Sequence, residues 1–174
     1  MRVIFRLFLE LCLFRRTPQD IPYSVFLFAF TLFLNILLAM VNLLVLVEES
    51  RRPALGDALQ YVAIRTVLFL GLIYIIMHLL GFKNRVLQTL TAIQGADTVL
   101  GLIFLLVGMA LSLLPEGSPL LILIIMLFLG WSLAIHSNIY RHALSVSLLT
   151  AGFLAAGLFF LEVLLEKKLS PVLM

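Results

Sequence analysis

The chain has 174 residues, of which 63% are hydrophobic and only 12% are charged, and its mean hydropathy is +1.20. Soluble domains carry about 25% charged residues, so this composition excludes a water-soluble fold. The formal net charge is +3, but the twelve Lys and Arg residues occur singly or in pairs between apolar runs, which excludes the continuous basic face of a nucleic-acid-binding protein.

The first segment, MRVIFRLFLELCLF, predicts a helix that lies at the membrane interface. Arg2, Arg6 and Glu10 recur every four positions and share one helical face, while apolar side chains occupy the rest of the turn. A cleaved signal peptide is the alternative. The apolar run contains a glutamate, however, and it ends in Arg15 and Arg16 without a small-residue cleavage site. Twin-arginine export is disfavoured because turn residues follow the pair, where such a leader needs an apolar stretch.

Five apolar stretches follow, and each approaches the roughly 20 residues that cross a hydrocarbon core about 30 Å thick. We expect an all-α membrane protein: a bundle of five transmembrane helices preceded by an N-terminal interfacial amphipathic helix. Residues 1–20 form that helix and its connection, 21–168 the membrane domain, and 169–174 a short tail. The predicted spans cover residues of about 23–47, 58–82, 96–114, 120–137 and 143–165.

The boundary between the last two spans rests on length. Residues 120–165 are almost continuously apolar, and one helix of that length would be roughly 70 Å long at about 1.5 Å per residue, so the chain must fold back. The polar interruption SNIYRH predicts a tight turn, in which Arg141 meets lipid headgroups and Tyr140 takes the interfacial aromatic position. A catalytic cluster within the membrane is the alternative interpretation of this stretch.

The distribution of Lys and Arg predicts the orientation, because cytoplasmic loops carry the excess of basic residues. The basic residues on the amino-terminal side of the five spans outnumber those on the other side. The first group is Arg2, Arg6, Arg15, Arg16, Lys83, Arg85 and Arg141, and the second is Arg51, Arg52, Lys167 and Lys168. We expect a cytoplasmic amino terminus, a carboxyl terminus on the opposite side, and the loop PEGSP, which has no basic residue, outside.

Two charged residues fall within predicted spans, Arg65 in the second and Glu162 in the fifth. Their expected depths are similar, and a charge inside a membrane either pairs with a partner or reaches the interface. Our hypothesis is an Arg65–Glu162 ion pair that fixes how the two helices pack, with Asp57 or Glu116 as substitute partners. The alternative is that both side chains extend separately to the headgroups.

Small residues predict close helix packing, since they let two backbones approach. They serve packing inside the monomer or, alternatively, an interface with a second copy or another membrane protein. Asn35 and Asn42, seven residues apart, are expected to hydrogen-bond across helices in the same region. The predicted packing residues are Gly101, Gly108, Ala151, Gly152, Ala155 and Ala156.

Metal, cofactor and catalytic sites are not predicted. His78, His136, His142 and Asp97 are expected near one membrane level, but His136 and His142 are six apart, whereas a zinc pair on one helix is spaced by four. The single cysteine, Cys12, rules out a cysteine cluster. Whether this level binds anything is left open.

Two segments together resemble the Yip-domain superfamily of five-span membrane proteins: HLLGFKNRVLQTLTAIQGADTVLG, and the later WSLAIHSNIYRHALSVS. The likeness covers about residues 20–166 and consists of a hydropathy order and a loop style. It implies a compact helical module with a cytoplasmic amino terminus. Eukaryotic relatives act in vesicle traffic and contact small GTPases through a long amino-terminal region. Only about twenty residues precede the first span here, so the chain is more similar to bacterial relatives, and the inner membrane is the expected location.

We expect a non-enzymatic protein that acts by packing, as a scaffold, assembly factor or accessory subunit whose partners are the bilayer and other membrane proteins or further copies of itself. The alternative is a small transporter or channel component. A carrier should have a water-accessible cavity that reaches Arg65 or Asn35, whereas a scaffold should be a closed bundle with an exposed small-residue face. All six prolines lie outside the predicted spans, which disfavours the broken helices of many carriers.

Overall fold

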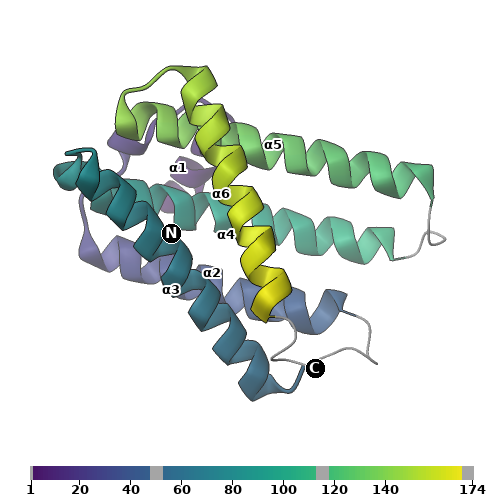
Figure 1. The fold of residues 1–174 in the computed structure, drawn as a ribbon. Coiled ribbons are helices and arrows are strands. Elements are labelled where there is room, and N and C mark those ends of the chain that lie inside the picture. Colours follow the sequence, from purple (N-terminus) through teal and green to yellow (C-terminus); the bar gives the residue numbers. More distant parts are fainter. Residues whose placement is uncertain (1, 48–52, 113–117, 170–174) are drawn as a thin grey trace.

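A computed structural model describes residues 2–47, 53–112 and 118–169. In these ranges the chain is helical throughout its regular structure and has no strand (Figure 1). Two short 3-10 turns, Pro18–Asp20 and Lys83–Arg85, join the helices at one end of the bundle. The six α-helices are α1 (Arg2–Cys12), α2 (Val25–Leu46), α3 (Leu55–Leu79), α4 (Val86–Leu111), α5 (Pro119–Leu144) and α6 (Leu148–Leu169).

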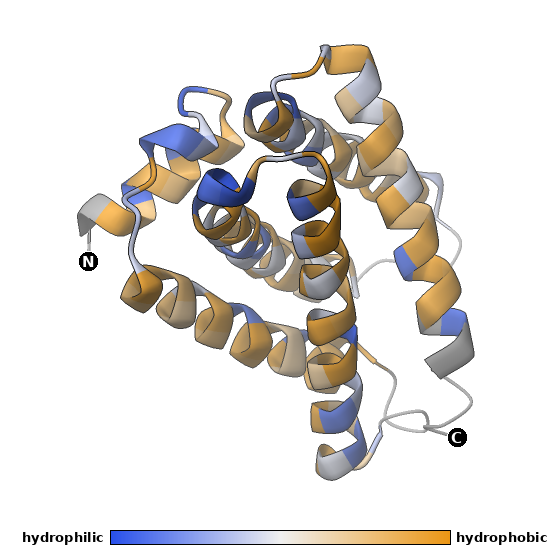
Figure 2. Ribbon diagram, turned by 60° about the vertical axis from the view of Figure 1, so that its left-hand side comes forward, coloured by the Kyte–Doolittle hydropathy of each residue, from blue (hydrophilic) through white to orange (hydrophobic). Residues whose placement is uncertain are grey.

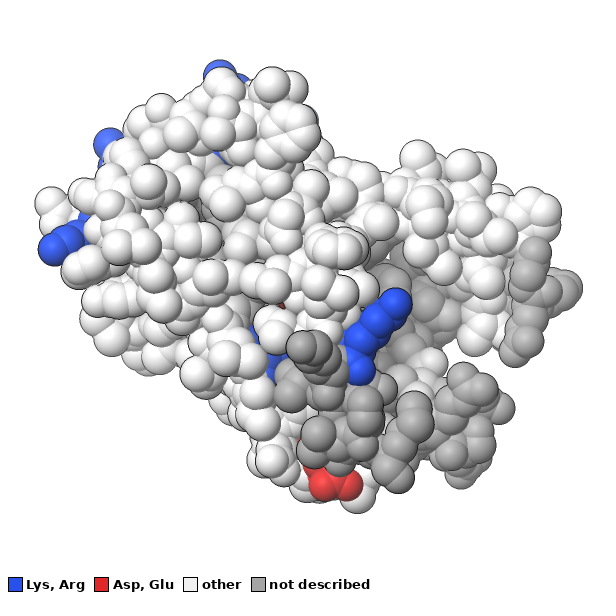
Figure 3. All heavy atoms as spheres, in the orientation of Figure 1, with Lys and Arg blue, Asp and Glu red and all other residues white. Residues whose placement is uncertain are grey.

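Five of these helices, α2 to α6, are long and apolar enough to cross a membrane, as predicted. Apolar residues dominate along their lengths, whereas hydrophilic residues gather at the helix ends and on inward faces (Figure 2). The face seen in Figure 3 carries few charged side chains, and exposed Phe, Leu and Ile residues are numerous on the long helices. Exposed apolar surface of this extent fits an integral membrane protein, whose outer face contacts lipid.

Helix α4 is the centre of the bundle. All side chains from Thr89 to Ala96 are buried, and the helix packs most extensively on α2, with further contacts to α1, α3 and α5. Helices α4 and α5 run side by side, and α6 packs on α5 while crossing both (Figure 1). Because α4 is surrounded, polar groups on its inward face lie in the interior of the protein rather than against lipid.

Helix α1 packs on the bundle through one face. Its side chains Phe8, Leu11 and Cys12 are buried, and the ring of Phe8 lies directly against Gly95, where the absence of a side chain leaves room for it. The indole Nε1 of Trp131 in α5 donates a hydrogen bond of 3.2 Å to the carbonyl oxygen of Cys12. These contacts tie α1 to α4 and α5.

The opposite edge of α1 carries a small ion-pair network. The Nε atoms of Arg6 and Arg16 lie 2.8 and 3.0 Å from the two carboxylate oxygens of Glu10. The pairing of Arg6 with Glu10 follows from their spacing of four, which places them on one side of a helix.

The predicted start of the third span was wrong. Helix α4 begins at Val86, not near residue 96, because its polar residues are satisfied within the fold. The hydroxyls of Thr89 and Thr91 donate to the carbonyl oxygens of Arg85 and Leu87, at 2.9 and 2.7 Å, one turn earlier. Such bonds let Thr residues sit inside a buried helix. The segment QTLTAIQGAD therefore extends the helix instead of preceding it.

The predicted turn at SNIYRH was also wrong, because residues 137–142 continue α5 as helix to Leu144. The Ser137 hydroxyl donates to the Leu133 carbonyl oxygen at 2.6 Å, and Tyr140 is 3% exposed, so it is a buried residue and not an interfacial one. Residues 145–147 make the actual turn. Ser145 there adopts a left-handed conformation with φ of 54°.

Arg85 holds this turn in place. Its Nη1 donates to the Ser145 hydroxyl at 2.9 Å and to the carbonyl oxygens of His142 and Ala143 at 3.4 Å. A cation at the carboxyl end of a helix satisfies carbonyl groups that have no partner within the helix, and it complements the helix dipole. The connection between α3 and α4 thereby fixes where α5 ends.

Several sequence predictions lie outside the described residues. These are the basic pair Arg51 and Arg52, residues 115–117 of the loop PEGSP with Glu116 among them, the side chains of Arg2 and Lys168, and nearly all of the predicted tail, from residue 170 onward.

Candidate functional site

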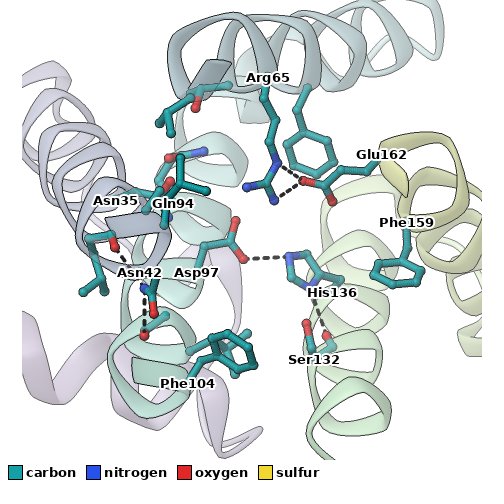
Figure 4. A pocket seen from close by; sticks show the side chains of 18 of the residues that line it. Asn35, Asn42, Arg65, Gln94, Asp97, Phe104, Ser132, His136, Phe159 and Glu162 are labelled. Atoms are coloured by element: carbon teal, nitrogen blue, oxygen red, sulfur yellow. Dashed lines mark hydrogen bonds and ion pairs between the residues drawn. The ribbon is translucent and has the colours of Figure 1, made fainter. Parts of the chain in front are cut away.

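A cavity of about 510 Å³ lies between helices α2 to α6. All five long helices contribute to its wall, so it exists only because the bundle is assembled. Its size falls in the range of about 300–1,000 Å³ that is typical of small-molecule sites. Polar side chains from each of these five helices line it, and Figure 4 shows several of them pointing into it. The polar lining residues include Asn35, Asn42, Tyr61, Arg65, Thr66, Gln94, Asp97, Ser132, His136, Tyr140 and Glu162.

Arg65 of α3 and Glu162 of α6 form an ion pair at one side of the cavity (Figure 4). The Nε of Arg65 donates to Glu162 Oε1 at 2.8 Å, and Nη2 donates to the same oxygen. The structure thus brings together the two residues that the sequence analysis paired. Their pairing joins α3 to α6 and leaves this side of the cavity without net charge.

Asp97 of α4 and His136 of α5 form a second pair. Asp97 Oδ1 lies 3.0 Å from His136 Nε2, and His136 Nδ1 lies 2.8 Å from the carbonyl oxygen of Ser132. The carbonyl oxygen accepts from Nδ1, and when Asp97 is ionised its carboxylate accepts from Nε2, so that both ring nitrogens donate. The arrangement is therefore that of a histidinium, which carries a positive charge next to Asp97.

Three buried polar atoms belong to residues that line the cavity and have no hydrogen-bond partner among the described residues: Asn42 Oδ1, Gln94 Oε1 and Tyr140 Oη. The orientation of the Asn42 amide is fixed, because its Nδ2 donates to the carbonyl oxygens of Leu38 and Gly101 at 2.9 and 3.2 Å. Its oxygen is left as an acceptor. A buried polar group without a partner costs about 1–3 kcal/mol, so these three atoms favour a polar occupant.

Aromatic rings complete the wall. Phe69, Phe104, Phe128 and Phe159 line the cavity together with Tyr61 and Tyr140. The Phe104 and Phe128 rings are 5.5 Å apart and join α4 to α5. Ring faces supply apolar contact area and a favourable surface for cations. The cavity thus combines a polar centre with aromatic walls.

The predicted packing residues are used mainly inside the monomer. A Cβ placed on Gly101 or Gly108 would meet Leu38 at 3.0 Å or Leu46 at 2.9 Å, so these glycines allow α2 to lie close to α4. Ala151 and Ala155 are buried, and Gly152 faces the Ser137 hydroxyl of α5. Ala156 is exposed, as is Gly157 beside it.

Of the predicted interfacial residues, the structure exposes four: Arg6, Arg15, Arg16 and Arg141. The predicted histidine level is not a cluster. His78 is exposed and stacks on Tyr74. Among the described residues no group of three or more His, Cys, Asp or Glu side chains could hold a metal ion.

The Asp97–His136 pair was missed by sequence reasoning, which placed these residues near the ends of their spans and apart from Arg65. The true helix bounds place both residues well inside α4 and α5, and both line the same cavity as Arg65 and Glu162. Gln94 and Asp97 are three apart on α4, and Ser132 and His136 are four apart on α5. That spacing on two facing helices was the available signal.

Comparison with protein-family models, with curated proteins and with solved structures found no match to this chain.

Proposed function

We propose that this protein binds a small polar solute inside the membrane and works as a small transporter or channel component. The observation that supports this is the cavity itself, which reaches Arg65 and Asn35 and is lined by two acid–base pairs. Ionisable residues within membrane helices commonly mark substrate or proton pathways. The cavity therefore favours a transporter or channel component over a scaffold or accessory subunit, the two functions considered from the sequence.

A scaffold or accessory subunit remains the second candidate, and one observation favours it. Ala156 and Gly157 form an exposed small-residue position on α6, where another membrane helix or a second copy could approach closely. The other predicted packing residues are already used inside the monomer, where Gly101 and Gly108 let α2 approach α4 and Ala151 and Ala155 are buried. The internal use of these residues makes a purely packing role the weaker proposal.

We propose a non-enzymatic role. Asp97 and Glu162 are each held by a cationic partner, and the His136 nitrogens bond to Asp97 and to a backbone carbonyl rather than to a hydroxyl nucleophile. Cys12 is fully buried against α4. A nucleophile activated by an adjacent base, which covalent catalysis requires, is not found among the described cavity residues.

The proposed setting is a bacterial inner membrane, with the amino terminus in the cytoplasm. The excess of Lys and Arg on the amino-terminal side supports this orientation. Helix α1 then lies at the cytoplasmic boundary, with Arg6 and Arg16 toward headgroups and Phe8 packed on α4. Membership of the Yip-domain superfamily is part of the same proposal, supported by the five long helices and by the two quoted segments.

Cysteine accessibility tests whether the cavity admits water-soluble molecules. In a Cys12→Ala background, Asn35→Cys and Thr66→Cys place thiols in the cavity wall, and Phe33→Cys and Val67→Cys place thiols on the outer surface of the same helices. We expect a charged methanethiosulfonate reagent to modify the cavity cysteines at least tenfold faster. Equal protection of all four cysteines would mean a closed bundle and would favour the scaffold.

A further inference from the structure

We propose that the solute is a protonated amine and that it enters the cavity in exchange for the proton on His136. This inference rests on the proposed function and specifies the solute class of the same site. It follows from the charges around the cavity, from its unpaired acceptors and from its aromatic walls.

The charges of the described cavity residues come from four helices. Arg65 of α3 and Glu162 of α6 cancel one another, and Asp97 of α4 is balanced by protonated His136 of α5. The lining residues of α2, whose polar members are Asn35 and Asn42, are uncharged, and Tyr61 and Tyr140 are the remaining titratable side chains of the lining. When His136 loses its proton, the cavity carries one net negative charge. Within a membrane that charge needs a replacement cation.

The hydrogen-bonding groups select for a donor. Asn42 Oδ1 is held as an acceptor, and Gln94 Oε1 is a second acceptor one helical turn from Asp97 on α4. Gln94 is 2% exposed and lines the cavity. An ammonium group has three donors and no acceptor, so it suits a cavity whose lining residues include a carboxylate and two amide oxygens without partners.

The rest of the solute is expected to be apolar or aromatic. Phe69, Phe104, Phe128 and Phe159 line the cavity, and aromatic faces attract cations. The exchange is balanced: protonated protein and the ammonium ion combine to give the amine-loaded protein and one free proton. No bond other than the N–H bond of His136 is broken.

Three probes of one shape test the solute class. Benzylammonium is cationic, benzyl alcohol is neutral and benzoate is anionic. Binding is measured by titration calorimetry at pH 7 on protein in phosphatidylglycerol nanodiscs, which contain no amine headgroup. Repeating the titration in buffers of different ionisation enthalpy counts the protons released. We expect benzylammonium alone to bind, with release of about one proton.

Variants test whether the calorimetric signal comes from binding in the cavity. Asp97→Asn should weaken benzylammonium binding at least tenfold, because it removes the carboxylate that pairs with the ammonium group. His136→Gln should abolish proton release while the cation still binds. The matched control Asp57→Asn changes an exposed carboxylate outside the cavity and should leave affinity and proton release unchanged. If Asp57→Asn weakens binding as much as Asp97→Asn does, the cation binds elsewhere and the inference is overturned.

The outcomes separate this inference from the proposed function. Binding of benzyl alcohol or benzoate in place of the amine would overturn the proposal that the solute is a cation. The proposal that the cavity binds a solute would stand. Amine binding without proton release would overturn the exchange. If no probe binds although the cavity cysteines react, the solute class is wrong and the proposed function stands; if those cysteines are also protected, both fail. Competition by added phosphatidylethanolamine would support the ammonium chemistry and identify a lipid headgroup as its source.

Discussion

At the scale of single residues, the molecule depends on pairs of polar groups that satisfy each other inside an apolar bundle. Arg65 binds Glu162, and His136 bonds to both Asp97 and a carbonyl group one turn earlier. An isolated charge at these positions would be costly within a membrane. Each pair therefore constrains two helices at once and also determines the chemistry of the cavity.

The first prediction concerns the Arg65–Glu162 pair. Breaking a buried ion pair costs about 3–5 kcal/mol, and because the Arg65 side chain is 42% exposed we expect roughly half of that for Arg65→Glu. The double variant Arg65→Glu, Glu162→Arg should recover most of the loss. The free energy of unfolding is measured by dodecyl sulfate titration in mixed micelles. Additive losses in the double variant would show that the two residues do not interact.

The second prediction concerns pH and the edge of α1. Hydrogen bonds from Arg6 and then Arg16 hold the pKa of Glu10 below its ordinary value. A lowered folded pKa means that the stabilisation is fully present above the unfolded pKa of about 4.3 and is lost as the pH falls through the folded value. In wild type we expect α1 to loosen in that acidic window.

Fluorescence of Trp131, the single tryptophan, measures this loosening, because its Nε1 donates to Cys12 of α1. Other carboxylates also titrate in acid, so Glu10→Gln serves as the comparison. The difference in Trp131 fluorescence between wild type and Glu10→Gln should be present at pH 7 and should vanish once Glu10 is protonated in wild type. A difference that persists unchanged at low pH would argue against this role of the ion pairs.

At the scale of whole elements, the five long helices were predictable because apolar length alone determines them. The ends of these helices were not predictable, and the errors at the start of α4 and at the end of α5 have the same cause. Thr89, Thr91 and Ser137 donate hydrogen bonds to carbonyl groups one turn earlier, so polar stretches that resemble loops continue as helix. Tertiary contacts decide this, since the bundle buries the same stretches.

The third prediction tests how α1 docks. Gly95→Leu should displace Phe8 from α4 and thereby expose Cys12, whereas Gly130→Leu places the same side chain where no atom lies within 4 Å. Burial, followed by the charge of Asp97, raises the pKa of the Cys12 thiol to about 12, so little reactive thiolate is present near pH 7.5.

Maleimide labelling of Cys12 gives the measurement. We expect wild type and Gly130→Leu to be protected and Gly95→Leu to react at least tenfold faster. Leucine is used instead of a β-branched residue because it is compatible with a helix, which leaves displacement of Phe8 as the main effect. Rapid labelling of wild type would place α1 away from α4.

At the scale of the whole molecule, the sequence predicted the Arg65–Glu162 pair but not the cavity. The pair was predictable because two charges at similar depth in separate spans have few other partners. The cavity depends on how five helices pack around Asp97, Gln94 and Asn42, and no single segment of the sequence determines that packing. The position of its polar groups could not be predicted from the sequence, because it depends on helix ends that tertiary contacts determine.

The fourth prediction concerns topology. Five crossings put the two ends of the chain on opposite sides, and the excess of Lys and Arg predicts a cytoplasmic amino terminus. Reporter fusions before residue 2 and after residue 169 should be active in opposite compartments. Both reporters active on the same side would require an even number of crossings.

The accessibility of the cavity within a bilayer tests the central claim most directly. In a Cys12→Ala background, nitroxide labels are attached to Ser132→Cys in the cavity wall and to Leu127→Cys, which is exposed on the outer surface of the same helix. Electron paramagnetic resonance then compares collisions with a water-soluble nickel chelate and with oxygen, which concentrates in lipid. A water-accessible cavity predicts a clearly higher nickel-to-oxygen ratio at Ser132 than at Leu127. An equal or lower ratio at Ser132 would contradict a solute-binding cavity.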